Sequence, residues 1–581
     1  MNKFEKRHGI MTFRRGSKGK GFQRGLLLAL AAGCGTAAAA DLGNTAVLAG
    51  NSEALQAWQQ GTGGQTPDLV QQADGGTTIE WHGGITLDKY VNSSSGGNTL
   101  TPTRGGSYYK AEVQGDLRGT AADGDLSYLQ LSLTNTDDRS VLSSHPTQIN
   151  SLLMGRAGKD YQVTLGDVVA SYSQLGTSLG LRGIGGQKMF GQSSMFSASA
   201  GVLAQSWEAL TNTVPRTQFL RNVYAGKAET AFGETWRGYV TTQGYSDDTG
   251  SLGQGMSLLA PASARTTTAG FAYQQGQLGV QGEAGVSRWQ EEGQQEHDDN
   301  AFIVDANWRV ESVGLRAGHH NIGRYYSSLS GMAAPGVQET YVAGDWSAAQ
   351  WVTFTADARH SVNEGAMNTI NAQKTDALLA GAFINFGQDW PGWGMMLNHS
   401  ESRGESANNG ASTENKGNGV SLFYYGQVWN GSLGYNEQNV SSNAAPGANA
   451  QATGWVGTVG RNWSDDSGVA GGMWMLGTNL TASMQEQRLD SGGSTRSTIF
   501  GLGVSAQRSG WGSLNASLSD GTTTQTTGGP DLRMRTYQVD AAYPFKGQNS
   551  LRFYLRSNRN GGSTAATYND RTVGLQLVYM L

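Results

Sequence analysis

This sequence has little of what stabilises a soluble protein or a helical membrane protein. Its one cysteine, Cys34, excludes an intrachain disulfide. Charged residues make up 15% of the chain, against about 25% in ordinary soluble domains, and there are only 10 prolines. The one long apolar run spans residues 26–40, and no later stretch approaches the ~20 apolar residues of a spanning helix. The 581 residues therefore predict neither a large soluble core nor a helical membrane domain.

The first 40 residues resemble a secretory signal peptide. Eight lysines and arginines precede the apolar run, and Ala38-Ala39-Ala40 supplies small residues for cleavage. A looser match, Ala31 to Cys34, resembles a lipoprotein processing site and leaves lipidation of Cys34 as an alternative. The first 40 residues hold eight of the 41 basic residues and one of the 46 acidic ones. The remaining residues therefore carry a net charge of −12. This acidic balance argues against nucleic acid as a partner.

Glycine and a two-residue alternation are what the chain has in abundance. Glycine accounts for 85 residues, roughly twice its usual share. In Tyr109–Leu117 one face is apolar and the other carries Lys110, Glu112 and Asp116. The same alternation recurs at 302–309, 352–359 and 537–543. Strands of this kind suit a wall between lipid and water, and in lipid only a closed barrel satisfies every backbone group of a sheet.

We therefore predict an all-β fold for residues 77–581, a single large transmembrane antiparallel β-barrel of about 24–26 strands. Short connections, such as Gln275-Gly276 and Lys546-Gly547, take turns with long ones, such as 321–337. That asymmetry is typical of short periplasmic turns and long extracellular loops. The strand number stays open at residues 169–215, where one hairpin is either present or absent. A barrel of this kind belongs in the outer membrane of a Gram-negative bacterium.

The last ten residues predict the closing strand of the barrel. Val573, Leu575, Leu577 and Tyr579 share one face of a strand that runs to the end of the sequence. Such an ending resembles the C-terminal signal that the barrel-insertion machinery recognises. The edge of this strand is expected to meet the first strand near Thr78–Leu87. The candidate residues of the insertion signal are Thr572, Gly574, Leu577, Tyr579 and Leu581.

The polar face of the wall is expected to line the lumen. It would act either as a selectivity lining or as a general wetting of the pore wall, and the presence of both signs of charge favours wetting. The candidate lining residues are Lys110, Glu112, Asp116, Asp305, Arg309, Asp357, Arg359, Asp540, Arg552 and Arg556. Residues 41–76 lack the alternation, and we expect a periplasmic tail, a partial lumen plug or a docking peptide there.

One segment, Thr164–Gly183, carries more information than a generic barrel strand. It contains Gly-Asp, then Ser, then Arg-Gly, a pattern that resembles the early barrel strands of usher-type export channels and related large exporters. The matching residues are Gly166, Asp167, Ser173, Arg182 and Gly183. The resemblance implies export of a large cargo. Ushers also carry a folded plug and flanking periplasmic domains, for which this chain has no room, so direct pilus assembly is not expected.

No arrangement of residues predicts catalysis, a metal site or a cofactor. His319 and His320 are neighbours in a strand, so their side chains point to opposite faces and cannot easily hold one ion. His399 and Ser400 are opposed in the same way, which argues against a hydrolase pair. We expect a non-enzymatic protein whose partners are outer-membrane lipid, the insertion machinery and a periplasmic or plug partner.

The size of the barrel suggests its function. A barrel of about 24 strands encloses a wider lumen than the 16- to 18-stranded porins, so something must close it. The candidates are a loop at 169–196 folded inward, the N-terminal segment or a partner subunit. Our leading hypothesis is a gated conduit for export of a large cargo, protein or polysaccharide. The alternatives are a diffusion porin for small solutes and a structural or adhesive surface barrel.

Overall fold

The computed structural model describes residues 77–580, with gaps at 97–103, 143–144, 212–215, 253–259, 331–333, 366–371, 407–409, 464–474, 509, 527–530 and 563–566. The chain divides into two compact units, Met1–Leu69 and Val70–Leu581, and all described residues belong to the second. The predicted signal peptide, the 41–76 segment and Leu581 lie outside the described residues. In the described part, no helix is both long enough and apolar enough to span a bilayer.

The second unit is built almost entirely of β-strands. The first half contains β1 (Thr78–Gly96), β2 (Gly106–Thr120), β3 (Leu126–Thr136), β4 (Thr147–Ala157), β5 (Tyr161–Ser171), β6 (Thr177–Phe190), β7 (Ser194–Leu203), β8 (Leu220–Phe232), β9 (Trp236–Asp248), β10 (Ala262–Gln275), β11 (Leu278–Glu291), β12 (His297–Val310), β13 (Val313–Ile322) and β14 (Leu329–Ser330). The second half contains β15 (Val337–Ala349), β16 (Val352–Asn363), β17 (Gln373–Asn385), β18 (Trp393–Ser406), β19 (Ser412–Tyr425), β20 (Trp429–Ser442), β21 (Ala450–Trp463), β22 (Met475–Leu489), β23 (Ser494–Arg508), β24 (Gly512–Gln525), β25 (Leu532–Phe545), β26 (Asn549–Gly562) and β27 (Tyr568–Met580). Three short helical pieces accompany them, α3 (Trp207–Leu210), η1 (Thr249–Ser251) and η2 (Pro446–Ala448).

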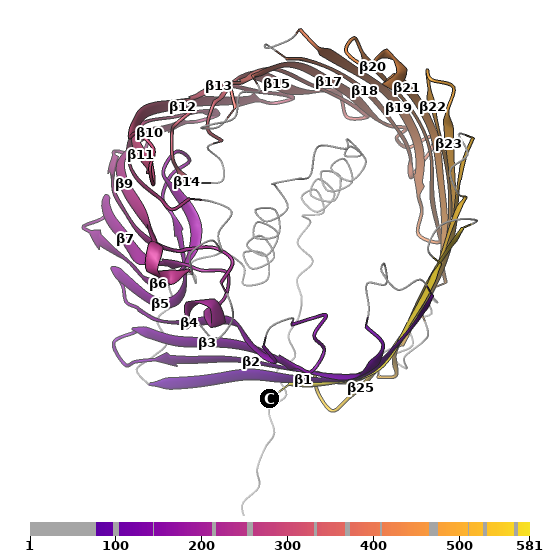
Figure 1. The fold of residues 1–581 in the computed structure, drawn as a ribbon, viewed down its shortest axis with the longest axis horizontal. Helices are drawn as coiled ribbons and strands as arrows, with labels where there is room; N and C mark the ends of the chain where they lie inside the picture. Colours follow the sequence, from indigo (N-terminus) through magenta and orange to yellow (C-terminus); the bar gives the residue numbers. More distant parts are fainter. Residues whose placement is uncertain are drawn as a thin grey trace, which may run out of the picture. The chain divides into compact units, whose positions relative to one another are not determined.

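The strands form a closed ring in which neighbours in the chain pair antiparallel. β1 pairs with β2 on one side and with the last strand, β27, on the other (Figure 1). Only β14 departs from this order: it pairs parallel with β6, and β13 pairs directly with β15. The remaining 26 strands make a closed antiparallel β-barrel, which confirms the predicted fold class and strand number. The seam uses Gly84–Gly96 of β1, further along the strand than expected.

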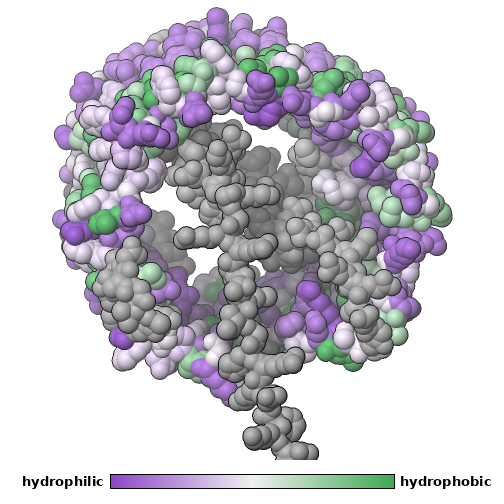
Figure 2. All heavy atoms as spheres, turned by 180° about the vertical axis from the view of Figure 1, so that it is seen from behind, coloured by the Kyte–Doolittle hydropathy of each residue, from purple (hydrophilic) through white to green (hydrophobic). Residues whose placement is uncertain are grey.

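The wall has two chemically different faces. On β27 the large apolar side chains of Val573, Leu575 and Tyr579 share one face and are each at least 40% exposed. The alternate positions of the wall strands carry most of its polar side chains, as Arg552 and Asp540 do on β26 and β25. Around the ring, hydrophobic residues surface at intervals among hydrophilic ones (Figure 2). An apolar outer face is what a barrel in lipid needs, because the hydrocarbon offers no hydrogen-bonding partners.

Tight turns join many strands at one end of the barrel. β10 ends at Gln275 and β11 begins at Leu278, and Gly276 between them has φ +56°, a conformation that favours glycine. β12 and β13 are joined equally tightly, as are β15 and β16. The connection from β21 to β22, at the same end, is longer and departs from this pattern.

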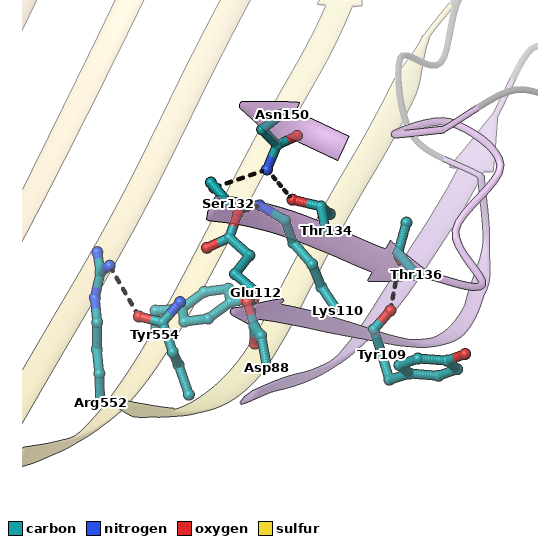
Figure 3. A network of polar contacts seen from close by, with 11 residues as sticks. Asp88, Tyr109, Lys110, Glu112, Ser132, Thr134, Thr136, Asn150, Arg552 and Tyr554 are labelled. Atoms are coloured by element: carbon teal, nitrogen blue, oxygen red, sulfur yellow. Dashed lines mark hydrogen bonds and ion pairs between the residues drawn. The ribbon is translucent and has the colours of Figure 1, made fainter. Parts of the chain in front are cut away.

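Polar side chains on the inner face cross the seam (Figure 3). Tyr554 of β26 donates its hydroxyl hydrogen to the Asp88 carboxylate of β1, with the oxygens 2.9 and 3.0 Å apart. It reaches across β27 because position 574 is glycine: a Cβ there would lie 2.2 Å from the Tyr554 ring. Thr572 of β27 donates to Asn92 of β1 over 2.9 Å. The seam is therefore held by side-chain bonds between three strands as well as by its backbone ladder.

Replacing Tyr554 by phenylalanine tests how much the seam depends on this bond. Tyr554→Phe keeps the ring over Gly574 but leaves Asp88 without its donor, so we expect the free energy of unfolding to fall by about 1–3 kcal/mol. The measurement is the midpoint at which the heat-modifiable, folded band is lost on semi-native electrophoresis. Tyr543→Phe is the matched control, because the outward-facing Tyr543 is 54% exposed. An equal midpoint for both variants would contradict a stabilising role for the seam bond.

Candidate functional site

The wall is interrupted where β5 turns away from β4. β4 pairs with β5 only between Leu153–Ala157 and Gln162–Gly166, and β6 pairs with β7 only from Arg182 onward. Between these limits the two strands pair with each other and not with the wall. We call this segment, Asp167–Leu181, the inner hairpin. It occupies the first part of the expected inward loop at 169–196, whereas the rest of that loop is wall strand in β6 and β7.

Two glycines form the bend at the base of the inner hairpin. Gly166 and Gly183 are directly opposite each other in the β5–β6 ladder. Gly166 has φ +107°, and a Cβ on it would lie 2.0 Å from the carbonyl oxygen of Leu152. A Cβ on Gly183 would lie 2.1 Å from the carbonyl oxygen of Ala200. No other residue type fits this close approach of backbones, so the strands bend here because both positions are glycine.

Two carboxylates accept hydrogen bonds from backbone amides of β4 that lie beyond its pairing with β5. Asp167 Oδ2 accepts a hydrogen bond from the Leu152 amide over 2.7 Å. Glu208, in the short helix α3, accepts one from the Ile149 amide over 2.6 Å. Trp207 of the same helix donates its indole N–H to Asp167 over 3.1 Å. Side chains thus satisfy two backbone donors on this edge of β4, in line with the cost of unpaired backbone groups in lipid.

Arg182 ties the base of the inner hairpin to the connection that carries α3. It is the register partner of Asp167, and the closest atoms of the ion pair, Nε and Oδ1, are 3.6 Å apart. Its guanidinium also donates to the carbonyl oxygen of Ala204 and lies 5.6 Å from the centre of the Trp207 ring. These contacts fix the direction in which the inner hairpin leaves the wall.

Beyond its base, the inner hairpin packs against the inner face of the neighbouring wall strands β8–β13. Its contacts form two apolar clusters inside the barrel, a feature that the lumen of a simple pore does not need. The first cluster comprises Val168, Ala170, Leu181, Val223, Tyr245, Ala264 and Trp289. The second comprises Leu175, Ala301, Ile303, Ile322 and Tyr326. Leu175 at the tip is only 1% exposed, and burying a leucine fully stabilises by about 1.5–3 kcal/mol.

A buried glutamate of β11 receives the tip of the inner hairpin. Glu283 is 3% exposed, and its Oε2 accepts hydrogen bonds from the amides of Gln174 and Leu175, over 3.1 and 3.2 Å. Tyr239 donates its hydroxyl hydrogen to the same oxygen over 3.1 Å. A cavity of about 250 Å³, lined in part by Ser173 and Glu283, lies beside this contact. We call Glu283 the latch, because it bonds the tip without being part of the hairpin.

A second segment, Gly323–Ser330 with β14, covers the tip from the other side, and we call it the strap. Tyr326 is fully buried and donates its hydroxyl hydrogen to the carbonyl oxygen of Leu175 over 3.1 Å. Burial raises the pKa of the Tyr326 phenol, which therefore stays a neutral donor. The Ser328 hydroxyl donates to the Gly176 carbonyl over 2.7 Å. β14, labelled inside the ring in Figure 1, pairs parallel with β6 at Thr177 and Ser178.

The structure brings together four of the five residues that carry the usher-like pattern and places the fifth, Ser173, at the tip of the inner hairpin. Gly166 and Gly183 form the bend, and Asp167 and Arg182 face each other directly beyond it. The Ser173 hydroxyl accepts from the Gly176 amide over 2.8 Å and shapes the tip. Sequence reasoning missed the partners of this segment, because they lie far away in the chain and no local pattern marks them: Trp207, Glu208, Glu283 and Tyr326.

The ten candidate lining residues lie on the face opposite the apolar one. Eight of them are in ion pairs, and a ninth, Asp305, forms a hydrogen bond of 2.8 Å with His320. Their role in selectivity stays a prediction, but the pairing neutralises most of their charge locally. Lys110 pairs with Glu112 (Figure 3), Asp116 with Arg118, Arg309 with Asp345, Arg359 with Asp357, and Arg552 with Asp540. Arg556 instead lies 5.6 Å from the centre of the Tyr554 ring. No single sign of charge dominates this set.

The solved structures to which this chain is similar match it at low identity and low TM-score. No protein-family model matches the sequence, and no curated protein matches it. The structure is similar to the P pilus usher (PapC) translocation pore, with 10% identity, a TM-score of 0.35, and coverage of 86% of this chain and 99% of that one. It is also similar to OpdK of Pseudomonas aeruginosa, solved with vanillate (11%, TM-score 0.27, coverage 55% and 94%), and to the siderophore receptor PirA of the same organism (11%, 0.37, 86% and 80%). At these values the likeness concerns the fold alone.

The closed ladder, the apolar outer face and the polar inner face together describe an outer-membrane β-barrel of a Gram-negative bacterium. A closed barrel with 26 wall strands encloses a wide lumen. What passes through it has to be argued from the inner hairpin.

Substituting the bend glycine tests whether the inner hairpin depends on it. Gly166→Ala places a Cβ 2.0 Å from a backbone oxygen at φ +107°, so we expect a loss of several kcal/mol and a sharply lower yield of folded barrel. The measurement is the heat-modifiable fraction after refolding. Gly501→Ala on β23 is the control, since its Cβ would meet its first neighbour at 3.6 Å. Equal yields for the two variants would show that the bend does not need glycine.

Removing the latch should loosen the inner hairpin without damaging the wall. Glu283→Ala leaves two tip amides without their acceptor, so amide hydrogen exchange in residues 167–181 is expected to rise at least about tenfold, whereas wall peptides stay unchanged. Hydrogen-exchange mass spectrometry measures both. Asp357→Ala, which removes an acid from the inner face at β16, controls for the loss of a charge. Unchanged exchange in the hairpin of the Glu283 variant would rule out the latch.

Proposed function

We propose that this outer-membrane channel is a gated conduit for export of a large cargo, a protein or a polysaccharide, and that the inner hairpin is its gate. The observation that carries the proposal is that the inner hairpin lies inside the barrel and shares no backbone ladder with its wall neighbours beyond Gly166 and Arg182. It can therefore move without breaking the pairing that closes the barrel.

The hold on the inner hairpin is of a strength that a partner or cargo can overcome. Its tip is held by the latch, by two hydrogen bonds from the strap, by the hydrogen bond from Thr177 to Gln243 and by burial of Leu175. Each hydrogen bond contributes about 0.5–1.5 kcal/mol net, so the tip contacts add up to several kcal/mol, and the first apolar cluster adds to the hold nearer the base. A permanent strand of the wall would be held by backbone pairing along its length and would not need these side-chain contacts at its tip.

The size of the barrel supports a large cargo. Lumen width grows with strand number, and 22-stranded outer-membrane barrels already need a plug. A barrel of 26 strands would breach the permeability barrier if it stood open, so the proposal includes a further closure by residues 41–76 or by a periplasmic partner. The resemblance of Thr164–Gly183 to the early barrel strands of usher-type export channels is the reason to propose export.

A disulfide between the hairpin tip and the wall tests the gate. A Cβ on Gly176 would lie 2.9 Å from the Thr241 hydroxyl oxygen but only 2.3 Å from that of Ser173, so all variants carry Ser173→Ala, and Gly176→Cys with Thr241→Cys then places two thiols within bonding reach. In planar bilayers we expect the oxidised double variant to be silent, and reduction to restore the rare large openings of the parent protein. Combining reduction with Glu283→Ala should make those openings at least about ten times more frequent.

Each single-cysteine variant, treated with the same oxidant and reductant, controls for the chemistry. A steady open conductance that is the same in the oxidised and reduced double variant would contradict the gate and favour a diffusion porin. Silence in all forms, including the reduced latch variant, would contradict a conduit and favour a structural or adhesive barrel.

A further inference from the structure

Four arginines gather on the outer face of β25, β26 and β27. They are Arg533, Arg535, Arg559 and Arg571, and together with the carboxylate of Asp520 on β24 we call them the arginine patch. Each arginine occupies an outward position of its strand, because it alternates in step with exposed apolar residues. These companions are Tyr537 on β25, Phe553 on β26, and Val573 and Leu575 on β27.

The register brings like charges into direct opposition. Arg535 of β25 is the cross-strand partner of Arg559 of β26, which puts their Cβ atoms about 4.5–5.5 Å apart. Arg571 of β27 is opposite Ser557, which is one outward position before Arg559 on β26. Like charges directly opposite each other destabilise a sheet, so this arrangement needs negative charge from elsewhere.

The protein supplies only part of that negative charge. Asp520 accepts from both Arg533 and Arg535, with shortest N···O distances of 2.7 and 2.6 Å. Arg559 and Arg571 are exposed and form no ion pair with any residue that the structure describes. Four guanidinium groups thus share one carboxylate, which leaves a local charge of +3.

On the outer face at the same end of β17–β20, the balance of acidic and basic side chains is different. Lys416 there lies 2.9 Å from Glu414 and 3.4 Å from Glu401, and His360 of β16 bonds to Asp376. Acidic residues outnumber the lysines and arginines on this stretch: Lys374, Arg403 and Lys416 stand against Asp376, Glu401, Glu405, Glu414 and Glu437. The excess of positive charge at the arginine patch is therefore absent from the β17–β20 stretch of the rim.

The position of the arginine patch along the strands indicates contact with lipid headgroups. Arg535 lies one outward position beyond the exposed Tyr537, about 7 Å further along the strand. The tight turn between β25 and β26, from Phe545 to Asn549, is at the opposite end. Aromatic residues at the ends of the apolar band mark the membrane interface, so the guanidinium groups come at the level where the headgroups of the outer leaflet begin.

We propose that the arginine patch binds the phosphate groups of a phosphorylated glycolipid of the outer leaflet. Guanidinium groups bind phosphate oxygens bidentately, and Arg559 and Arg571 have donors free among the described residues for such bonds. A phosphate between the opposed Arg535 and Arg559 removes the repulsion that the register creates. The site anchors one side of the barrel to the leaflet, independently of what passes through the lumen.

Thermal unfolding with and without lipid tests the proposal on the full-length protein in neutral detergent. We expect lipid A with two phosphates to raise the unfolding midpoint of the parent protein, and lipid A without phosphates to have no effect. For Arg535→Gln with Arg559→Gln, the apparent affinity for the bisphosphorylated lipid should fall at least about tenfold, as expected for the loss of charge-assisted bonds. Without lipid, this variant should be at least as stable as the parent, because the repulsion is gone.

The matched control is Arg403→Gln with Lys416→Gln, which removes the same number of charges from the outer face of β18 and β19 and should leave lipid A binding unchanged. Equal binding by the patch variant and the parent would overturn the proposal. So would phosphatidylglycerol that raises the midpoint as much as bisphosphorylated lipid A does, since any anionic lipid would then suffice.

Discussion

The constraint on which the rest of the structure depends is that no backbone N–H or C=O group can stay unpaired in lipid. A sheet meets it only by closing, and β27 closes the ring on β1 with a continuous antiparallel ladder. The seam residues follow from that requirement. Gly574 has no side chain because the Tyr554 ring crosses it to reach Asp88, so a residue first noticed as part of an insertion signal also has a packing reason.

The same constraint explains the chemistry at the one place where a wall strand turns inward. When β5 bends at Gly166, the edge of β4 loses its partner, and the acceptors that replace it are carboxylates, from Asp167 and Glu208. Charged groups beside a membrane would be costly if they were unpaired. Here they accept strong hydrogen bonds from backbone amides and from Trp207, which makes them part of the wall. The base of the inner hairpin thus supplies hydrogen bonds to the wall. The tip takes no part in these bonds.

Much of the fold could be predicted from the two-residue period, because alternate residues of a barrel strand face lipid and the lumen and differ in polarity accordingly. The class, the strand number and the closing role of Thr572–Met580 were predicted in this way. The inner hairpin was harder. Gly166, Asp167, Arg182 and Gly183 stood out as a pattern, but nothing local says that the segment beyond them leaves the wall. Its partners Glu283 and Tyr326 lie more than 100 residues away, and only the closed ring brings them to the tip.

The mixture of contacts around the tip decides how the inner hairpin can behave. Apolar burial of Leu175 under Tyr326 would by itself favour a permanently packed segment, whereas hydrogen bonds to the latch alone would compete with water. Together they add up to several kcal/mol, and a shift from 1:99 to 99:1 between two positions needs about 5.5 kcal/mol of differential binding. A partner that contacts only the released hairpin over a modest surface can supply that amount. Because the wall ladder ends at Gly166 and Arg182, the stability of the barrel is separate from the equilibrium that we propose for the inner hairpin.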